Sequence, residues 1–112
     1  MFPAPVVTAA YEDGNLVLRW DKINSTELVE YRVVISEKNN TPAYPADGFY
    51  NAPYSADTTS VTIDPTNVYT NGDFTALTYG NEYYFSVTAV YKNNKYVAGN
   101  VVKIIYLISD NE

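Results

Sequence analysis

The sequence predicts an all-β fold, a single antiparallel immunoglobulin-like β-sandwich of about seven strands. Nearly every apolar stretch is short, alternates with polar residues, and is rich in Val, Ile, Tyr and Thr, which fit a pleated sheet. Turn segments such as Asp13-Gly14-Asn15 and Lys92-Asn93-Asn94-Lys95 separate these stretches at roughly regular intervals. Helical periodicity is weak throughout. This combination is typical of two packed antiparallel sheets.

Three strands are predicted in the first third of the chain. The first follows Pro3 and Pro5, which suit a strand start because proline cannot donate to a hydrogen-bond ladder. The second and third each place alternate apolar side chains on one face, as a half-buried strand requires. Their expected ranges are residues 6–11, 16–20 and 31–36.

Residues 37–57 are predicted to form a long irregular connection, with a short strand near Phe49 and Tyr50. Loops of this length are uncommon in small domains and are often either functional or packed down by their own aromatic side chains. The segment carries many turn-forming residues, including Asn39-Asn40, Pro42, Pro45, Asp47-Gly48 and Pro53.

The second half of the chain is expected to add three strands, over residues 59–63, 82–91 and 96–107. The segment 82–91 has the strongest alternation in the chain. The last strand is interrupted at Ala98-Gly99-Asn100, where glycine permits a bulge. A further turn is expected at Asn71-Gly72-Asp73.

Composition limits both the number of domains and the chemistry. A chain of 112 residues, 46% hydrophobic, fits one compact domain, with its core over about residues 4–108. Histidine and cysteine are absent, which excludes Ser-His-Asp and Cys-His catalysis, thiol redox chemistry and disulfides. The formal charge of −6 opposes binding to nucleic acid or to an anionic membrane. Apolar runs of about six or seven residues are also too short to span a bilayer.

The segment 77–90, Leu-Thr-Tyr-Gly-Asn-Glu-Tyr-Tyr-Phe-Ser-Val-Thr-Ala-Val, resembles the Leu-x-Pro-Gly-Thr-x-Tyr-x-Val-x-Val-x-Ala segment of fibronectin type III domains. Trp20 in Leu-x-Leu-x-Trp and Tyr31 in Tyr-x-Val-x-Ile resemble the second and third strands of that family. The resemblance therefore covers nearly the whole chain. The sequence departs from the family in having Tyr79 where proline is usual and in its enlarged middle region.

Five large side chains are expected in the core. A tyrosine just inside a strand that follows a sharp turn can bury its ring while its hydroxyl bonds the main chain a few residues upstream. Tyr83 is the candidate for this role, with Leu77 as a buried anchor beneath it. Trp20 is expected to fill the centre of the sandwich against Tyr31 and Phe85.

Aromatic residues in the 37–57 connection form the candidate ligand-binding site. Exposed rings beside amide and carboxylate groups can stack on pyranose faces and bind sugar hydroxyls. The same rings would also serve to cover one edge of the sandwich and protect it from pairing with other chains. Both explanations remain open. The residues concerned are Tyr44, Asp47, Phe49, Tyr50, Asn51 and Tyr54.

No catalytic residue, cofactor or metal site is predicted. Paired carboxylates are the catalytic device that the composition still allows, but the acidic residues mostly lie beside turn-forming residues, where a carboxylate caps a turn. Calcium is an alternative, because carboxylates supply the hard oxygen ligands that it prefers. The spacing of Asp47, Asp57, Asp64 and Asp73 matches no calcium-loop pattern.

The resemblance implies a non-catalytic extracellular module that acts as a spacer, a support or an interaction domain in a bacterial secreted or cell-surface protein. Its partners would be neighbouring domains, a polysaccharide or another protein, and the module is expected to be monomeric. Met1 ahead of a Pro-containing start and the polar end Ser109-Asp110-Asn111-Glu112 predict excision from a longer chain.

Two alternative functions remain. The first is a polysaccharide-binding module that uses the loop aromatics. The second is the ectodomain of a membrane-bound anti-sigma factor. It rests on the segment 40–49, which resembles a variant of the fibronectin type III module in clostridial cell-surface and anti-sigma-factor proteins.

Overall fold

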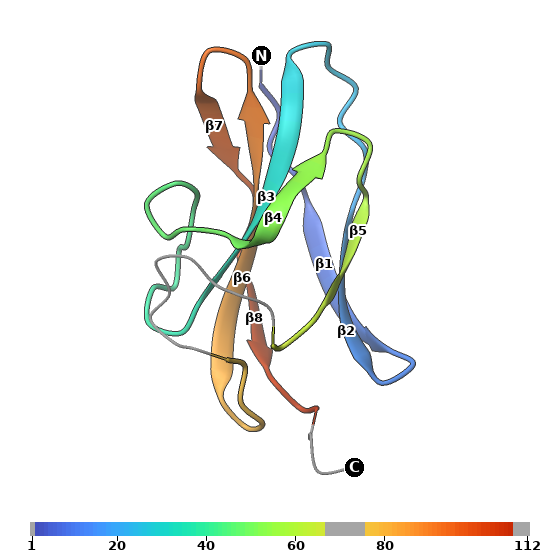
Figure 1. The fold of residues 1–112 in the computed structure, drawn as a ribbon, viewed down its shortest axis with the longest axis vertical. Coiled ribbons are helices and arrows are strands. Elements are labelled where there is room, and N and C mark those ends of the chain that lie inside the picture. The colour runs from blue at the N-terminus through green and yellow to red at the C-terminus, as the bar shows by residue number, and fades with distance from the viewer. Residues whose placement is uncertain (1, 67–75, 109–112) are drawn as a thin grey trace.

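The computed structural model describes residues 2–66 and 76–108, and within them the chain forms eight β-strands and no helix. Two antiparallel sheets pack face to face (Figure 1), so the predicted β-sandwich is confirmed. The turn expected at residues 71–73 lies outside the described residues. The strands are β1 (Val7–Glu12), β2 (Asn15–Trp20), β3 (Leu28–Ser36), β4 (Tyr50–Ser55), β5 (Ser60–Ile63), β6 (Glu82–Tyr91), β7 (Lys95–Ala98) and β8 (Val102–Ile105).

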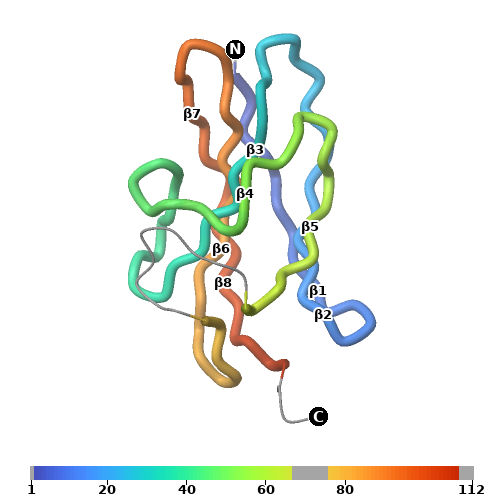
Figure 2. Tube along the Cα trace, in the orientation of Figure 1, coloured from blue at the N-terminus to red at the C-terminus, as the bar shows by residue number. Residues whose placement is uncertain are grey.

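One sheet has three strands in the order β1-β2-β5, and the other has five. In the larger sheet β4, β3 and β6 are neighbours, and β6 pairs with β7 at its C-terminal end and with β8 at its N-terminal end. The backbone trace in Figure 2 shows β7 and β8 following one another along β6. The predicted last strand is thus divided in two at Gly99.

A close backbone approach explains the requirement for glycine at position 99. A Cβ atom at Gly99 would lie 2.1 Å from the carbonyl oxygen of Pro5, which is too close for any other residue. The start of β1 is held at the same place, because the Asn100 side chain accepts from Val7 N at 2.7 Å and donates to Val7 O at 2.9 Å. The break between β7 and β8 therefore leaves room for the backbone of Pro5 and binds the first residue of β1.

Both predicted hairpin turns have the backbone conformation that their residues favour. The β1–β2 turn has positive φ at Asp13 (51°) and Gly14 (81°). The β6–β7 turn has positive φ at Asn93 (63°) and Asn94 (58°). Two consecutive residues of positive φ match the right-handed twist of the strands that they join, and Asn, Asp and Gly reach this conformation most easily.

Strand β4 is longer than the short strand expected near Phe49 and Tyr50. It occupies residues that were expected to be irregular, and it accommodates Pro53 because it pairs only with β3 and lies at the edge of its sheet. The irregular connection is thereby reduced to residues 37–49, followed by β4.

The core between the sheets contains all five large side chains expected there. Trp20 and Tyr31 are almost completely buried and meet edge to face, with their ring centroids 5.2 Å apart. The Tyr83 hydroxyl accepts a hydrogen bond of 2.8 Å from the backbone N–H of Thr78, five residues upstream. Leu77 and Phe85 belong to the same buried cluster. The bond between Thr78 and Tyr83 holds the turn before β6 against that strand.

Candidate functional site

The loop 37–49 lies on the outer face of the five-stranded sheet. Ser86 Oγ on β6 donates to the carbonyl oxygen of Pro42 at 2.6 Å, and the backbone N–H of Tyr44 donates to Thr88 Oγ1 at 3.1 Å. Ser86 and Thr88 point away from the core, yet both are fully buried, as is Val34 on β3. The loop therefore covers a face of this sheet as an additional layer.

Asp47 maintains the shape of this loop. Its carboxylate accepts from the backbone N–H of Ala43 at 2.9 Å and from Asn39 Nδ2 at 3.0 and 3.1 Å. The backbone N–H of Asp47 in turn donates to the Ala43 carbonyl at 2.9 Å. These contacts assign the Asp47 side chain to the internal structure of the loop.

An arginine side chain lies against the aromatic rings on this face. The Arg32 guanidinium lies 4.7 Å from the ring centroid of Tyr44 and 4.3 Å from that of Phe49. Its Nε bonds Glu30 Oε2 at 2.7 Å, and Tyr96 on β7 meets Tyr44 edge-on at 5.4 Å. We call Arg32, Tyr44, Phe49 and Tyr96 the Arg32 cluster. Cation–π contacts of this kind hold a loop to a sheet because the ring faces attract the delocalised charge.

The other predicted aromatic residues lie elsewhere, which corrects the expectation that all four rings gather in one loop. Tyr50 is a core residue, 2% exposed, and its hydroxyl accepts from the backbone N–H of Asp64 at 2.6 Å. Tyr54 lies opposite Tyr31 in the β3–β4 ladder and packs against the core. Asn51 is exposed and donates to the Tyr54 hydroxyl at 3.0 Å. The alternation of β4 draws these rings inward.

The structure also brings together residues that the sequence analysis missed. Arg32 and Tyr96 are far apart in the sequence and meet Tyr44 only because β3, β6 and β7 are neighbours in one sheet. The outward position of Arg32 in its alternating strand was a detectable signal. The position of the loop across that face was not, because no local pattern encodes it.

The acidic residues considered for calcium binding have separate partners. Asp57 Oδ1 pairs with Lys22 Nζ at 2.9 Å. Asp64 accepts from the backbone N–H and the hydroxyl of Thr66, and these bonds hold the pKa of the Asp64 carboxyl below its usual value. Asp73 lies outside the described residues. Among residues 2–66 and 76–108, no three acidic side chains gather in a way that would hold a metal ion.

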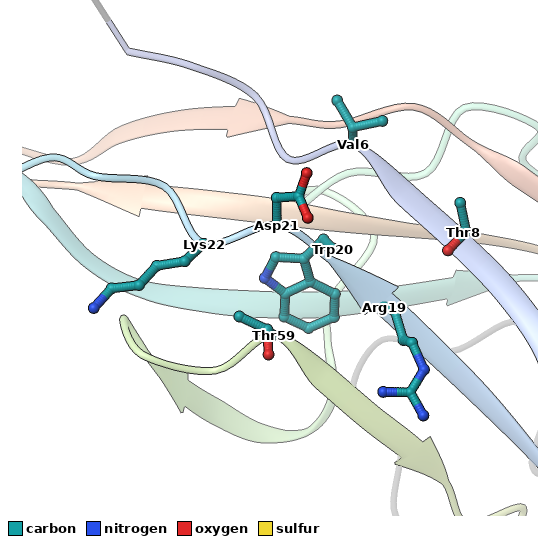
Figure 3. Close-up of a pocket in the computed structure, with 7 residues that line it drawn as sticks. All are labelled: Val6, Thr8, Arg19, Trp20, Asp21, Lys22 and Thr59. Carbon is teal, nitrogen blue, oxygen red and sulfur yellow. The ribbon is translucent and has the colours of Figure 1, made fainter.

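A hollow of about 410 Å³ opens at the end of the three-stranded sheet where β1 begins and β2 ends. Its lining includes the buried indole of Trp20 and the side chains of Thr8, Arg19 and Thr59 (Figure 3). Asp21 and Lys22 extend from the segment that follows β2. Within the described part of the chain, no helix is long and apolar enough to cross a membrane.

No protein-family model matches the chain, and no curated protein matches it. Solved structures do match. The pectate lyase Pel3 of Pectobacterium carotovorum is 16% identical with a TM-score of 0.57, and the match covers 90% of this chain and 27% of that one. The spore cortex lytic enzyme SleM of Clostridium perfringens is 14% identical with a TM-score of 0.63, covering 92% and 28%.

A family 28 exopolygalacturonase of Yersinia enterocolitica is 19% identical with a TM-score of 0.52, and the match covers 96% of this chain and 21% of the enzyme. Identities this low show a shared β-sandwich fold. The chain spans between a fifth and about three tenths of each of these three proteins. The matched region is therefore a small part of a larger carbohydrate-active enzyme in each case.

Proposed function

We propose that this chain is a non-catalytic, fibronectin type III-like module that acts as a spacer in an extracellular multidomain protein. The observation that carries the proposal is the placement of the terminal segments. The segment before β1 lies at one end of the long axis, and the segment after β8 lies at the other (Figures 1 and 2). The molecule measures 44 Å along its longest axis, so domains joined to the two ends would be held well apart.

Both terminal segments are fastened to the body of the sandwich. At the N-terminal end, the Tyr91 hydroxyl donates to the carbonyl oxygen of Pro3, and Asn100 makes the two bonds to Val7 described above. At the other end, the Tyr11 hydroxyl donates to Ile105 O at 2.7 Å and accepts from Leu107 N at 3.0 Å. Terminal segments held by side-chain bonds keep a fixed orientation, whereas free segments act as flexible linkers.

The comparisons support the same proposal. In each of the three enzymes named above, a region similar to almost the whole of this chain is accompanied by a much longer stretch of other sequence. The anti-sigma-factor hypothesis has no support beyond its loop sequence and stays a prediction.

Distance measurements between the two ends test the spacer proposal. The chain has no cysteine, so Ala4→Cys and Leu107→Cys introduce spin labels at two defined sites. We expect electron–electron double resonance to give one narrow distance distribution. Asn100→Ala should broaden it, because Val7, the first residue of β1, then loses both of its bonds to the Asn100 side chain.

Two results would count against the proposal. A broad distribution in the parent protein would mean that the terminal segments are flexible. Reproducible turnover of polygalacturonate, xylan or peptidoglycan by the purified chain would contradict the non-catalytic assignment.

A further inference from the structure

A groove at the end of the three-stranded sheet consists of two adjoining hollows that share Lys22. The first hollow is the one in Figure 3. The second, of about 430 Å³, extends over the segment between β2 and β3 and is lined in part by Asn24, Ser25 and Thr26. Both volumes lie in the range of about 300–1,000 Å³ that is typical of small-molecule sites. We propose that this groove binds a neutral oligosaccharide whose chain crosses Lys22.

The charge of the groove favours a neutral ligand. The two hollows are lined by two cations, Arg19 and Lys22, and by two carboxylates, Asp21 and Asp57, so the lining is formally neutral in a chain of charge −6. Lys22 Nζ lies 2.9 Å from Asp57 Oδ1, and Arg19 pairs with a carboxylate outside the groove, Glu12, at 2.6 Å. Because both cations are already paired, an anionic ligand would compete with carboxylates for them.

The remaining polar groups suit a ligand that carries many hydroxyls. Thr8 and Thr59 in the first hollow, and Ser25 in the second, each have a hydroxyl that both donates and accepts. Asn24 adds an amide with two donors and an acceptor. The Lys22–Asp57 pair offers a charged donor beside a charged acceptor, and charge-assisted hydrogen bonds to hydroxyls are stronger than neutral ones.

The indole N–H of Trp20 lies beneath the surface of this site. Trp20 is 4% exposed, and its Nε1 is buried with no hydrogen-bond partner in the described part of the chain. In Figure 3 the nitrogen edge of the indole is turned toward the Lys22 side of the hollow. A buried N–H without a partner destabilises the folded state. A ligand oxygen that reached it after a shift of the lining side chains would gain a bond without displacing another.

The position of Lys22 decides the length of the ligand. Lys22 lines both hollows, which are similar in volume, and each hollow has its own hydroxyl groups. A single sugar unit would use only one hollow. A chain of several units would contact both and would bond the ion pair between them.

The single tryptophan makes the test direct. In a ¹H–¹⁵N spectrum, Trp20 gives the only indole resonance. We expect this resonance to move and saturate when linear β-1,4-linked hexasaccharides of glucose, xylose or mannose are added, with a dissociation constant at or below the millimolar range. Tetragalacturonate serves as the anionic probe and should bind more weakly than the best neutral chain.

Matched variants locate the site. Lys22→Ala and Thr59→Ala should each weaken binding, and we expect a loss of about tenfold for Lys22→Ala, which removes the group common to both hollows. Lys103→Ala is the control, because it removes a comparably exposed lysine, paired with Glu82 at 3.4 Å, from the other sheet. It should leave the affinity unchanged.

Three outcomes would overturn the proposal. The first is an indole resonance that does not move with any neutral hexasaccharide at about 10 mM, a concentration that detects millimolar affinities. The second is a saturating shift that persists unchanged in Lys22→Ala and in Thr59→Ala. The third is tighter binding of tetragalacturonate than of every neutral chain. The spacer proposal is tested without ligand and does not depend on this result.

Discussion

The outer faces of the two sheets are built differently. On the five-stranded sheet, the outward-pointing side chains of Val34, Ser86 and Thr88 are each 0% exposed, because the loop 37–49 lies over them. On the three-stranded sheet, the outward-pointing side chains of Arg19 and Thr62 are exposed. The loop thus buries part of the outer face of the five-stranded sheet. The outer face of the three-stranded sheet is exposed at Arg19 and Thr62, although Val17 on that face is only 7% exposed.

This difference indicates whether an aromatic cluster serves packing or ligand binding. The Arg32 cluster joins the loop to the sheet, and the buried hydroxyls beneath it bond to the loop backbone. The loop is therefore a third layer of the fold, and its rings serve packing first. The groove at Lys22 lies beside the open face, where polar groups meet solvent. A binding function is better sought there than among the larger number of aromatic residues in the loop.

A carboxylate introduced beneath the loop should lower the stability of the protein more than any other change considered. Val34→Asp would place a charge beneath the loop, and we expect it to lower the free energy of unfolding by about 3–5 kcal/mol. Thr62→Asp makes a comparable change on the open face of β5 and should stay within about 0.5 kcal/mol of the parent protein. Urea denaturation followed by the fluorescence of Trp20 measures both.

The two variants together show whether the loop stays packed on the sheet in solution. If Val34→Asp proves as mild as Thr62→Asp, the loop does not stay on the sheet in solution, and the two outer faces are equivalent.

A smaller effect is expected from one buried hydroxyl. Ser86→Ala removes the donor to the Pro42 carbonyl and leaves that oxygen without this bond, at a cost of about 1–3 kcal/mol. Ser60→Ala, at an exposed position on β5, is the matched serine control and should cost less than about 0.5 kcal/mol. Equal midpoints for the two variants in urea would show that the bond to the loop contributes nothing to stability.

The strands were predictable because their signals are local. The pairs Asp13-Gly14 and Asn93-Asn94 favour the tight turns that they form, and alternation places Trp20 and Tyr83 in the core. Strand β4 was harder to predict. Pro53 and the turn residues around it favour an irregular segment, and only its position beside β3 at a sheet edge permits a ladder there.

The site was far less predictable, because it depends on contacts between distant segments. Tyr44 and Phe49 do lie together, but Arg32 and Tyr96 complete their cluster from two other strands. Tyr50 belongs to the core because it is the first residue of β4, which the sequence predicts only as a short strand near Phe49 and Tyr50. The groove at Lys22 has no sequence motif at all. It arises where the end of β2 and the start of β5 meet the segment that leads into β3.

The smallest expected effect concerns the exposed ion pair on the open sheet. Arg19 bonds the Glu12 carboxylate at 2.6 and 3.1 Å, and this hydrogen bonding holds the pKa of Glu12 below its usual value of 4.5. A carboxyl whose pKa is lowered by folding stabilises the native state above its unfolded pKa and loses that contribution as the pH falls through the folded value.

The denaturation midpoint should therefore decline as the pH falls below about 4.5, and Glu12→Gln should reduce the slope of that decline. Asp64, whose pKa is also lowered, remains in both proteins and accounts for part of the slope that persists. Added salt should weaken the Glu12 contribution because both partners face solvent. An identical pH dependence in Glu12→Gln and in the parent protein would show that the pair on the open face contributes nothing, whereas the buried bonds under the loop would be unaffected.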